Sequence, residues 1–209
     1  MLTILAMNKF KEYIHLYGLW NALSRVLKAV LWKVVHFTWD KAYLMSRSKQ
    51  EEIPLLEPVD FTIRRLKRED LFEDANWEVY IGECANLLLR CFDSDYAQSY
   101  GAFVDGRLAY VTWILYDHLE IDGEHRFFKD CAMQWKAFCL SEFRGRGLHD
   151  YLKAWAVKEM LRNGVKKCYA VTLAYNRPAL KAQNKCGYVI ERTFYMFKLG
   201  KRMFYRWSN

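Results

Sequence analysis

The sequence predicts an α/β protein whose central sheet mixes antiparallel hairpins with one pair of parallel strands. Residues 100–116 and 188–207 each contain two runs of β-branched and aromatic residues around a short turn, which is typical of a hairpin. Between them, 131–140 and 166–175 have strand composition and flank a helical pattern over 148–162. A strand, a helix and a strand in this order predict a right-handed crossover between parallel strands.

Residues 8–48 are predicted to be helical because their apolar residues recur every three or four positions. Residues 51–60, with Pro54 and Pro58, have the composition of a linker. We therefore expect an amphipathic basic helical extension over 1–50, a linker over 51–60 and one domain over 61–209. The apolar stripe of the extension is Leu16, Leu19, Trp20, Leu23, Val26, Leu27, Val30, Leu31, Val34 and Val35.

The remaining elements of the domain follow from local signals. A short strand is expected at 61–66, and Asp105-Gly106 supplies the turn of the first hairpin. Residues 117–130 are polar and are predicted to form a loop. Asn163-Gly164 ends the helix over 148–162. The other expected helices are 77–92, with Trp77, Ile81, Cys84, Leu88 and Cys91 on one face, and 177–186, with Pro178 in its first turn and Gly187 after its end.

Composition excludes several classes of protein. The six cysteines show no paired spacing and the five histidines are dispersed, so neither a disulfide framework nor a zinc site is expected. No run reaches the ~18 apolar residues of a membrane span, and the N-terminal residues lack the pattern of a signal peptide. We therefore expect a cytoplasmic protein without a metal.

The formal charge of +8 is unevenly distributed. Residues 1–50 hold eight Lys and Arg against two Asp and Glu, whereas 51–209 hold 24 against 22. A nearly balanced main domain argues against nucleic-acid binding. Three placements stay open for the basic N-terminal helix: packing on the sheet, pairing in a homodimer, or peripheral contact with the inner face of a membrane.

The stretch "SEFRGRGLHDYL", residues 141–152, places Gly145 and Gly147 directly before a helix. A helix start with small residues is a natural anion site, because its unpaired N–H groups and the positive end of its dipole point the same way. No Gly-Lys-Ser/Thr follows, so it is not a Walker loop. Asp150 stands where a dinucleotide fingerprint has its third glycine.

Two motifs resemble those of the GCN5-related N-acetyltransferase family. "FCLSEFRGRGLHDYL" is similar to that family's acyl-CoA motif, and "NRPALKAQNKCGY" is similar to its second signature. The order of elements over 61–207 is also similar, whereas residues 1–60 carry no resemblance. The resemblance implies an N-acetyltransferase with acetyl-CoA as co-substrate and a small-molecule amine as acceptor. A longer acyl group from acyl-CoA or acyl carrier protein, and a catalytically inactive coenzyme A-binding module, are the alternatives.

The resemblance also implies which residues bind the coenzyme. Backbone amides of the turn would hold the pyrophosphate, and the strand before it would pair with the pantetheine arm. Cys139 is expected to contribute its backbone and not to act as a nucleophile. The implied binding residues are Phe138, Cys139, Leu140, Arg144, Gly145, Arg146, Gly147, Leu148, His149, Asn176 and Ala179.

The sequence departs from the family pattern at two positions. Glu142 stands where the family usually has Gln or Arg, and Gln183 stands where the family often has a Tyr that protonates the leaving thiolate. Tyr175, with Tyr188 and Tyr195 as alternatives, is the expected proton donor. Asp130 is the expected general base, chosen from Asp117, His118, Glu120, Glu124, His125 and Asp130.

Overall fold

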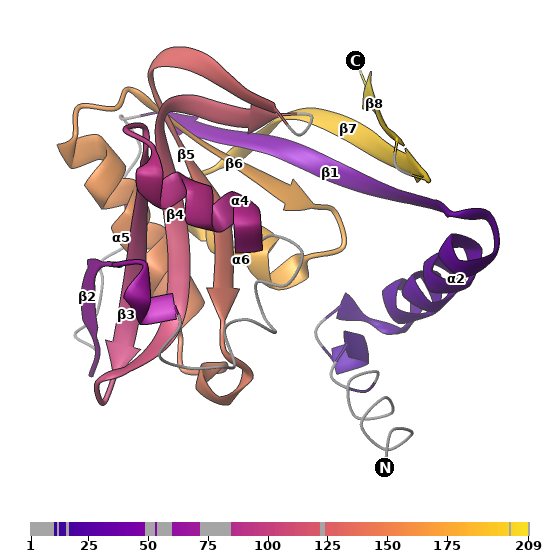
Figure 1. The fold of residues 1–209 in the computed structure, drawn as a ribbon, viewed down its shortest axis with the longest axis horizontal. Helices are drawn as coiled ribbons and strands as arrows, with labels where there is room; N and C mark the ends of the chain where they lie inside the picture. The colour runs from indigo at the N-terminus through magenta and orange to yellow at the C-terminus, as the bar shows by residue number, and fades with distance from the viewer. Residues whose placement is uncertain are drawn as a thin grey trace. The chain divides into compact units, whose positions relative to one another are not determined.

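The computed structural model describes residues 11, 13–15, 17–48, 53, 60–71, 85–121, 124–200 and 202–208. It confirms the predicted α/β class with a mixed sheet, whose strands follow the order β2-β3-β4-β5-β6-β1-β7-β8 (Figure 1). The strands are β1 Phe37–Ser48, β2 Thr62–Arg65, β3 Ala97–Val104, β4 Arg107–Ile121, β5 Glu124–Cys139, β6 Lys167–Leu173, β7 Val189–Leu199 and β8 Arg202–Ser208. The helices are α2 Leu19–Val35, α4 Ala85–Arg90, α5 Leu148–Arg162 and α6 Arg177–Lys185, with short 3-10 turns η1 Glu69–Leu71, η3 Cys91–Asp93 and η4 Ser141–Phe143.

The chain forms two compact units. The first takes Met1–Met45, Val171–Asn184 and Val189–Asn209, and the second takes Ser46–Ala170 and Lys185–Tyr188. Strands β1 and β6 each contribute residues to both. The expected linker lies largely outside the described residues, as do residues 77–84 of the expected helix at 77–92. The domain boundaries drawn from the sequence stay a prediction.

The core of the second unit lies between α5 and the β3–β4–β5 meander. Tyr110, Trp113 and Ile114 of β4 are fully buried, and α5 packs on β4 and β5. The β3–β4 hairpin turns at Asp105-Gly106 with φ values of 49° and 78°, as the sequence predicts. Helix α5 also ends where predicted, with Asn163 as its C-cap and Gly164 at φ 81°.

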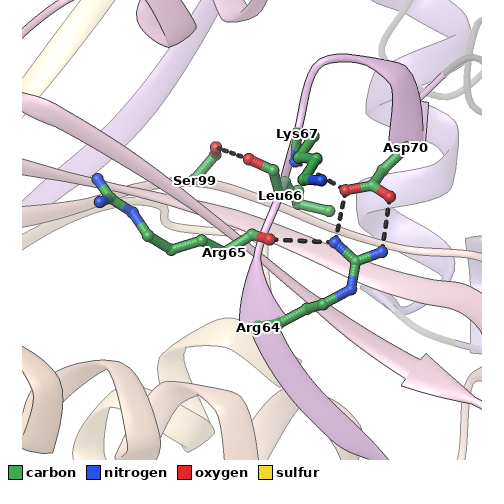
Figure 2. A network of polar contacts seen from close by, with 6 residues as sticks. All are labelled: Arg64, Arg65, Leu66, Lys67, Asp70 and Ser99. Atoms are coloured by element: carbon green, nitrogen blue, oxygen red, sulfur yellow. Dashed lines mark hydrogen bonds and ion pairs between the residues drawn. The ribbon is translucent and has the colours of Figure 1, made fainter.

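A network of hydrogen bonds stabilises the segment that follows β2. The Arg64 guanidinium donates two hydrogen bonds to the Asp70 carboxylate at 2.7 and 2.6 Å, and the Lys67 backbone N–H donates a third at 2.7 Å (Figure 2). Because the bonds favour the charged form, the Arg64 contact holds the pKa of Asp70 below its ordinary value. The neighbouring Leu66 carbonyl accepts from Ser99 of β3, so this segment is tied to the meander.

In the first unit, the helix predicted over 8–48 ends earlier than expected, and that part of the prediction was wrong. Helix α2 ends at Val35, where His36 adopts a left-handed conformation at φ 53°, and Phe37–Ser48 form strand β1. The physical reason is composition, since Phe37, Thr38 and Trp39 are β-formers and weak helix-formers. Residues 37–48 therefore belong to the sheet and do not extend the helix.

Most of the apolar stripe of α2 is exposed among the described residues, so packing on the sheet of its own unit, one of the three expected placements, is not observed for it. Eight large apolar side chains of the helix keep about half or more of their surface exposed, from 45% at Leu23 to 82% at Trp20, whereas Leu31 is half-buried. Ala22, on another side of the helix, is fully buried. The stripe is therefore open within the part of the chain that the structure describes.

The polar segment 117–130 is not a loop, and that prediction was wrong. Its described residues continue β4 to Ile121 and β5 from Glu124 in one long antiparallel pair, with Glu120 opposite His125. The register shifts between Tyr116 and His118, and Asp117 and Asp130 both have positive φ, at 52° and 60°. Such a bulge bends a hairpin, and the end of this one arches away from the line of the strands (Figure 1).

Candidate active site

Strand β5 separates from β6 before it reaches the glycine turn. The two strands are parallel, as predicted, but their register runs only from Cys131↔Lys167 to Met133↔Tyr169, whereas β5 continues to Cys139. A bulge at Lys136, with φ 46°, lies in the unpaired stretch, and Thr112 donates a hydrogen bond to its carbonyl at 3.1 Å. The edge of β5 that faces β6 is thus open over its last residues.

Of the three strand residues expected to pair with a ligand, Cys139 turns its backbone to the open edge. The Leu140 N–H donates to the Ala109 carbonyl of β4 at 3.0 Å. In an antiparallel pair hydrogen-bonded residues alternate, so Phe138 bonds to β4 and the groups of Cys139 point the other way. Burial raises the pKa of the Cys139 thiol to about 11, so the side chain is a thiol at neutral pH and a poor nucleophile.

The turn after β5 needs glycine for its backbone conformation. Gly145 and Gly147 have φ values of 80° and 75°, a region that L side chains rarely adopt. A Cβ built on either glycine would meet nothing within 4 Å, so the space beside the turn is open. Gly147 is the N-cap of α5 and supplies no side-chain hydrogen bond to the first turn. The amides at this helix start are therefore available to an anion.

Cations neutralise the two carboxylates nearest this turn. Arg107 pairs with Glu142 at 2.6 Å, so the acidic residue that departs from the family pattern does not present an unbalanced charge. Lys185 pairs with Asp150 in the first turn of α5. Arg144 donates from Nε to the Cys139 carbonyl at 3.3 Å. The backbone N–H of Cys139 is then the group of that residue that a ligand could meet on the open edge. Together with exposed Arg146, these cations outnumber the carboxylates around the turn.

The side chain of His149 lies beneath the turn. Its Nδ1 is 3.1 Å from the hydroxyl of Tyr110, which is itself fully buried. Burial lowers the pKa of His149 to about 4, with the Lys153 charge adding to the effect, so the ring is neutral at physiological pH. His149 therefore joins the first turn of α5 to β4 through Tyr110, and its predicted role toward a coenzyme rests on its backbone amide.

Lys153 is a buried cation that the sequence did not single out. It lies on α5 with 4% of its surface exposed, and burial lowers its pKa to about 8. Only the ionised form of Cys186 would act in the opposite direction and raise that pKa. The sequence did not indicate this burial. Lys153 stands between apolar Leu152 and Ala154, but adjacent residues of a helix point in different directions, and a lysine in a helix is usually at the surface.

Asp130, the expected general base, forms an ion pair. Lys166 donates from Nζ to its Oδ2 at 2.7 Å, and the hydrogen bond keeps the pKa of Asp130 below its ordinary value. Its backbone N–H donates to the Asp117 carboxylate at 2.7 Å, so both residues of the bulge are fixed. Asp130 precedes the paired start of β5–β6, nine residues before Cys139 along the strand. A carboxylate with a lowered pKa is a weaker proton acceptor.

Glu120, another residue of the expected set, lies much closer to the middle of β5. The Trp135 indole Nε1 donates to the Glu120 carboxylate at 3.1 Å, and the Glu120 backbone N–H lies 3.2 Å from the Met133 sulfur. Met133 is the last β5 residue paired with β6, and Trp135 follows it on the open stretch. The bent hairpin thus brings a carboxylate to the point where the two strands separate.

The second signature is divided between the units, since its residues 176–184 lie in the first and Lys185–Tyr188 lie in the second. The Asn176 side chain accepts a hydrogen bond from the Ala179 N–H at 3.3 Å, and its carbonyl accepts from Leu180 at 3.0 Å, which makes it the N-cap of α6. Gln183, where the family often has Tyr, is buried in the same helix. The motif therefore has a structural role, and its role toward a coenzyme stays a prediction.

Tyr175, the expected proton donor, belongs to an aromatic cluster of the first unit. Its ring lies 5.8 Å from that of Tyr17 and 6.5 Å from that of Tyr13. Burial raises its pKa above the ordinary value, so it releases a proton less readily. Tyr195, one alternative, lies half-buried in β7, where the Lys41 ammonium is 5.9 Å from its ring. Tyr188, the other, is buried in the second unit, and burial raises its pKa far above the ordinary value. No cluster of three or more potential metal ligands occurs among the described residues.

No family model and no curated protein matches the sequence. Solved structures do match the fold. An acetyltransferase of the GNAT family from Colwellia psychrerythraea aligns with a TM-score of 0.57 and 15% identity over 78% of this chain and 57% of its own. A GCN5-related N-acetyltransferase-like protein from Streptococcus suis aligns at 0.52 and 13%, over 85% and 68%. A Drosophila protein aligns at 0.56 and 22%, over 85% and 57%.

The chain thus spans little more than half the length of two of these structures. At identities of 13–22% the similarity concerns the fold. It agrees with the features described above, namely the parallel pair that separates and the glycine turn that opens α5. The chain therefore has the fold of the GCN5-related N-acetyltransferases.

Proposed function

We propose that the protein transfers an acetyl group from acetyl-CoA to a small-molecule amine. The observation that carries this proposal is the turn at Gly145 and Gly147, which opens α5 with uncapped amides beside free space. Such a turn fits a diphosphate, because the amides donate hydrogen bonds and no Cβ blocks the approach. The surplus of cations around it, Arg144 and Arg146 included, favours the same ligand.

The open edge of β5 supports the second half of the coenzyme contact. Cys139 has an N–H directed away from β4, where it can donate to an amide of the pantetheine arm, in the manner of an added strand. The edge leads from the turn back toward Met133, where β5 and β6 separate. Asn176 and Ala179 stay predicted coenzyme contacts in the other unit.

The chemistry needs one bond formed and one broken. The bound coenzyme supplies an activated acetyl thioester. The neutral acceptor amine attacks the carbonyl carbon, so that a C–N bond forms and the C–S bond breaks. The nitrogen gives up one proton to a base of the site, and the leaving thiolate takes up one proton from an acid of the site or from water. Asp130 is the predicted acceptor, and Glu120 is the second candidate, favoured by its contact with Trp135.

Thiol release from acetyl-CoA tests the proposal, measured against a panel of small amines, amino sugars and peptides with free N-termini. Turnover that depends on an amine supports it. Coenzyme A binding by calorimetry without any turnover would identify an inactive binding module, which the buried Gln183 would then explain. Faster release from a long-chain acyl-CoA than from acetyl-CoA would identify the alternative donor. Absence of coenzyme A binding at millimolar concentration would overturn all three.

A further inference from the structure

Helix α2 turns its polar side toward its own unit. The Lys28 ammonium bonds to the Asp40 carboxylate of β1 at 2.6 Å and lies 5.3 Å from the ring of Trp39. Arg25 lies 4.4 Å from the Tyr13 ring. At 100° per residue, these two cations stand on one side of the helix. The usual amphipathic helix buries its apolar side instead.

The opposite side of α2 is apolar and exposed. Trp20 keeps 82% of its surface accessible, and Val34 keeps 72%. The full set, which we call the α2 apolar face, is Leu19, Trp20, Leu23, Val26, Leu27, Val30, Val34 and Val35. A contiguous apolar face of this length on a helix surface indicates an interaction site. No helix among the described residues is long and apolar enough to cross a membrane.

The turn of the β7–β8 hairpin adjoins the end of this face. The Gly200 N–H donates to the His36 carbonyl at 2.7 Å, and the Lys198 ammonium lies 4.8 Å from the Trp32 ring. The hairpin exposes further apolar side chains beside this turn, among them Leu199 at 53% and Phe204 at 50%. Exposed apolar residues are therefore concentrated in the first unit.

Charge identifies what this surface would contact. The sequence of the first unit holds thirteen Lys and Arg against three Asp and Glu, a net charge of +10, and the second unit holds nineteen against twenty-one, a net charge of −2. Exposed Lys33 and Arg202 belong to α2 and β8, the elements that carry the apolar residues. A second copy of the chain would bring another unit of +10 against this one, which is unfavourable. An anionic bilayer offers both an apolar layer and a negative surface.

We propose that the α2 apolar face docks on a bilayer containing anionic phospholipid. The helix lies in the plane of the interface with Trp20 among the acyl chains, and the surrounding Lys and Arg contact the headgroups. This surface serves attachment, and it is independent of the acyl-transfer chemistry.

Co-sedimentation of the full chain with vesicles tests this proposal. The vesicles are phosphatidylcholine alone, or phosphatidylcholine with about 30% phosphatidylglycerol, at about 0.05 M and about 0.5 M salt, because surface charges are screened more strongly at high salt. We expect pelleting with the anionic vesicles at low salt, weaker pelleting at high salt, and little with the neutral vesicles. Equal pelleting with neutral vesicles would overturn the requirement for anionic lipid.

A matched pair of variants locates the contact. Trp20→Asp should weaken vesicle binding at least about tenfold, because it places a charge in the apolar layer. Phe127→Asp makes the same kind of change at an aromatic residue that is 66% exposed in the second unit, and binding should stay unchanged. Leu27→Asp serves as a second α2 variant, and the thermal unfolding of each variant shows that it remains folded. Equal loss in all three variants would overturn the assignment to α2.

Sedimentation velocity on the wild type distinguishes the membrane from the other possible occupant of this face, a second copy of the chain. A monomer that pellets with anionic vesicles supports the proposal. A dimer that Trp20→Asp dissociates, with no vesicle binding at low salt, would overturn it and assign the face to contact between copies. Absence from the low-salt pellet in a protein that stays monomeric would overturn it as well.

Discussion

Trp135 donates its indole N–H to the carboxylate of Glu120 at 3.1 Å, although the register places Trp135 opposite Trp113 and Glu120 opposite His125. The bulge at Asp117 and Asp130 bends the hairpin, and the bend makes this contact possible. It holds a carboxylate beside the residue at which β5 parts from β6. If the acetyl group is transferred at that point, Glu120 is placed to receive the proton of the acceptor amine.

Glu120→Gln should therefore lower kcat by about 10²–10⁴-fold, the usual contribution of a general base, while coenzyme A affinity stays unchanged. The amide keeps the bond from Trp135 but accepts no proton. Asp130→Asn is the matched change at the other candidate, and steady-state kinetics on both variants decides between them. A large loss of kcat in Asp130→Asn alone would restore the residue preferred from the sequence.

Gly147→Ala should weaken coenzyme A binding beyond its effect on stability. A Cβ at φ 75° costs about 1–2 kcal/mol in backbone strain, and it also stands in the space where the diphosphate would lie. Gly164→Ala is the control, because that glycine has φ 81°, equally open surroundings, and a place at the other end of α5. Both variants should lose stability in chemical unfolding, and only the first should lose affinity in calorimetry. Equal loss of affinity would contradict a phosphate role for the turn.

Lys153 should make the stability of the protein depend on pH in the alkaline range. Its pKa is about 8 in the folded protein and 10.5 ordinarily, so between these pH values the unfolded chain binds more protons and stability rises with pH. Compared with Lys153→Met, the wild type should gain roughly 3 kcal/mol of unfolding free energy across that window. Urea unfolding of both proteins at several pH values measures the difference. If the difference in unfolding free energy between the two proteins stayed constant over this pH range, the pKa of Lys153 in the folded protein would be close to its ordinary value.

Local signals made part of the fold predictable. The positive φ values of Gly145, Gly147 and Gly164 follow from glycine's freedom, and the ends of α5 were predicted correctly for this reason. The end of α2 had no such signal, because His36 occupies a left-handed position that usually carries Gly or Asn. The helix was therefore predicted to continue into the residues that form β1.

The candidate site was predictable only in its local half. Motif spacing identified the glycine turn. The contact between Glu120 and Trp135 joins residues that are fifteen apart in the chain and depends on the bend of the hairpin between them. The polar composition of 117–130 resembled that of a loop because polar side chains such as Arg126 and Lys129 remain exposed even within the strand. A non-local contact of this kind leaves no periodic trace in the sequence.

The place of β1 in the strand order has a consequence during synthesis. Its two neighbours are β6 and β7, and β6 begins at Lys167, about 120 residues after Ser48. At ribosomal rates of about 5–20 residues per second, the nascent strand waits roughly 6–24 s for its first partner. During this interval the apolar residues Leu44 and Met45, which are buried in the finished protein, have no strand to pair with. These residues therefore stay exposed to non-native contacts until β6 and β7 have been synthesised.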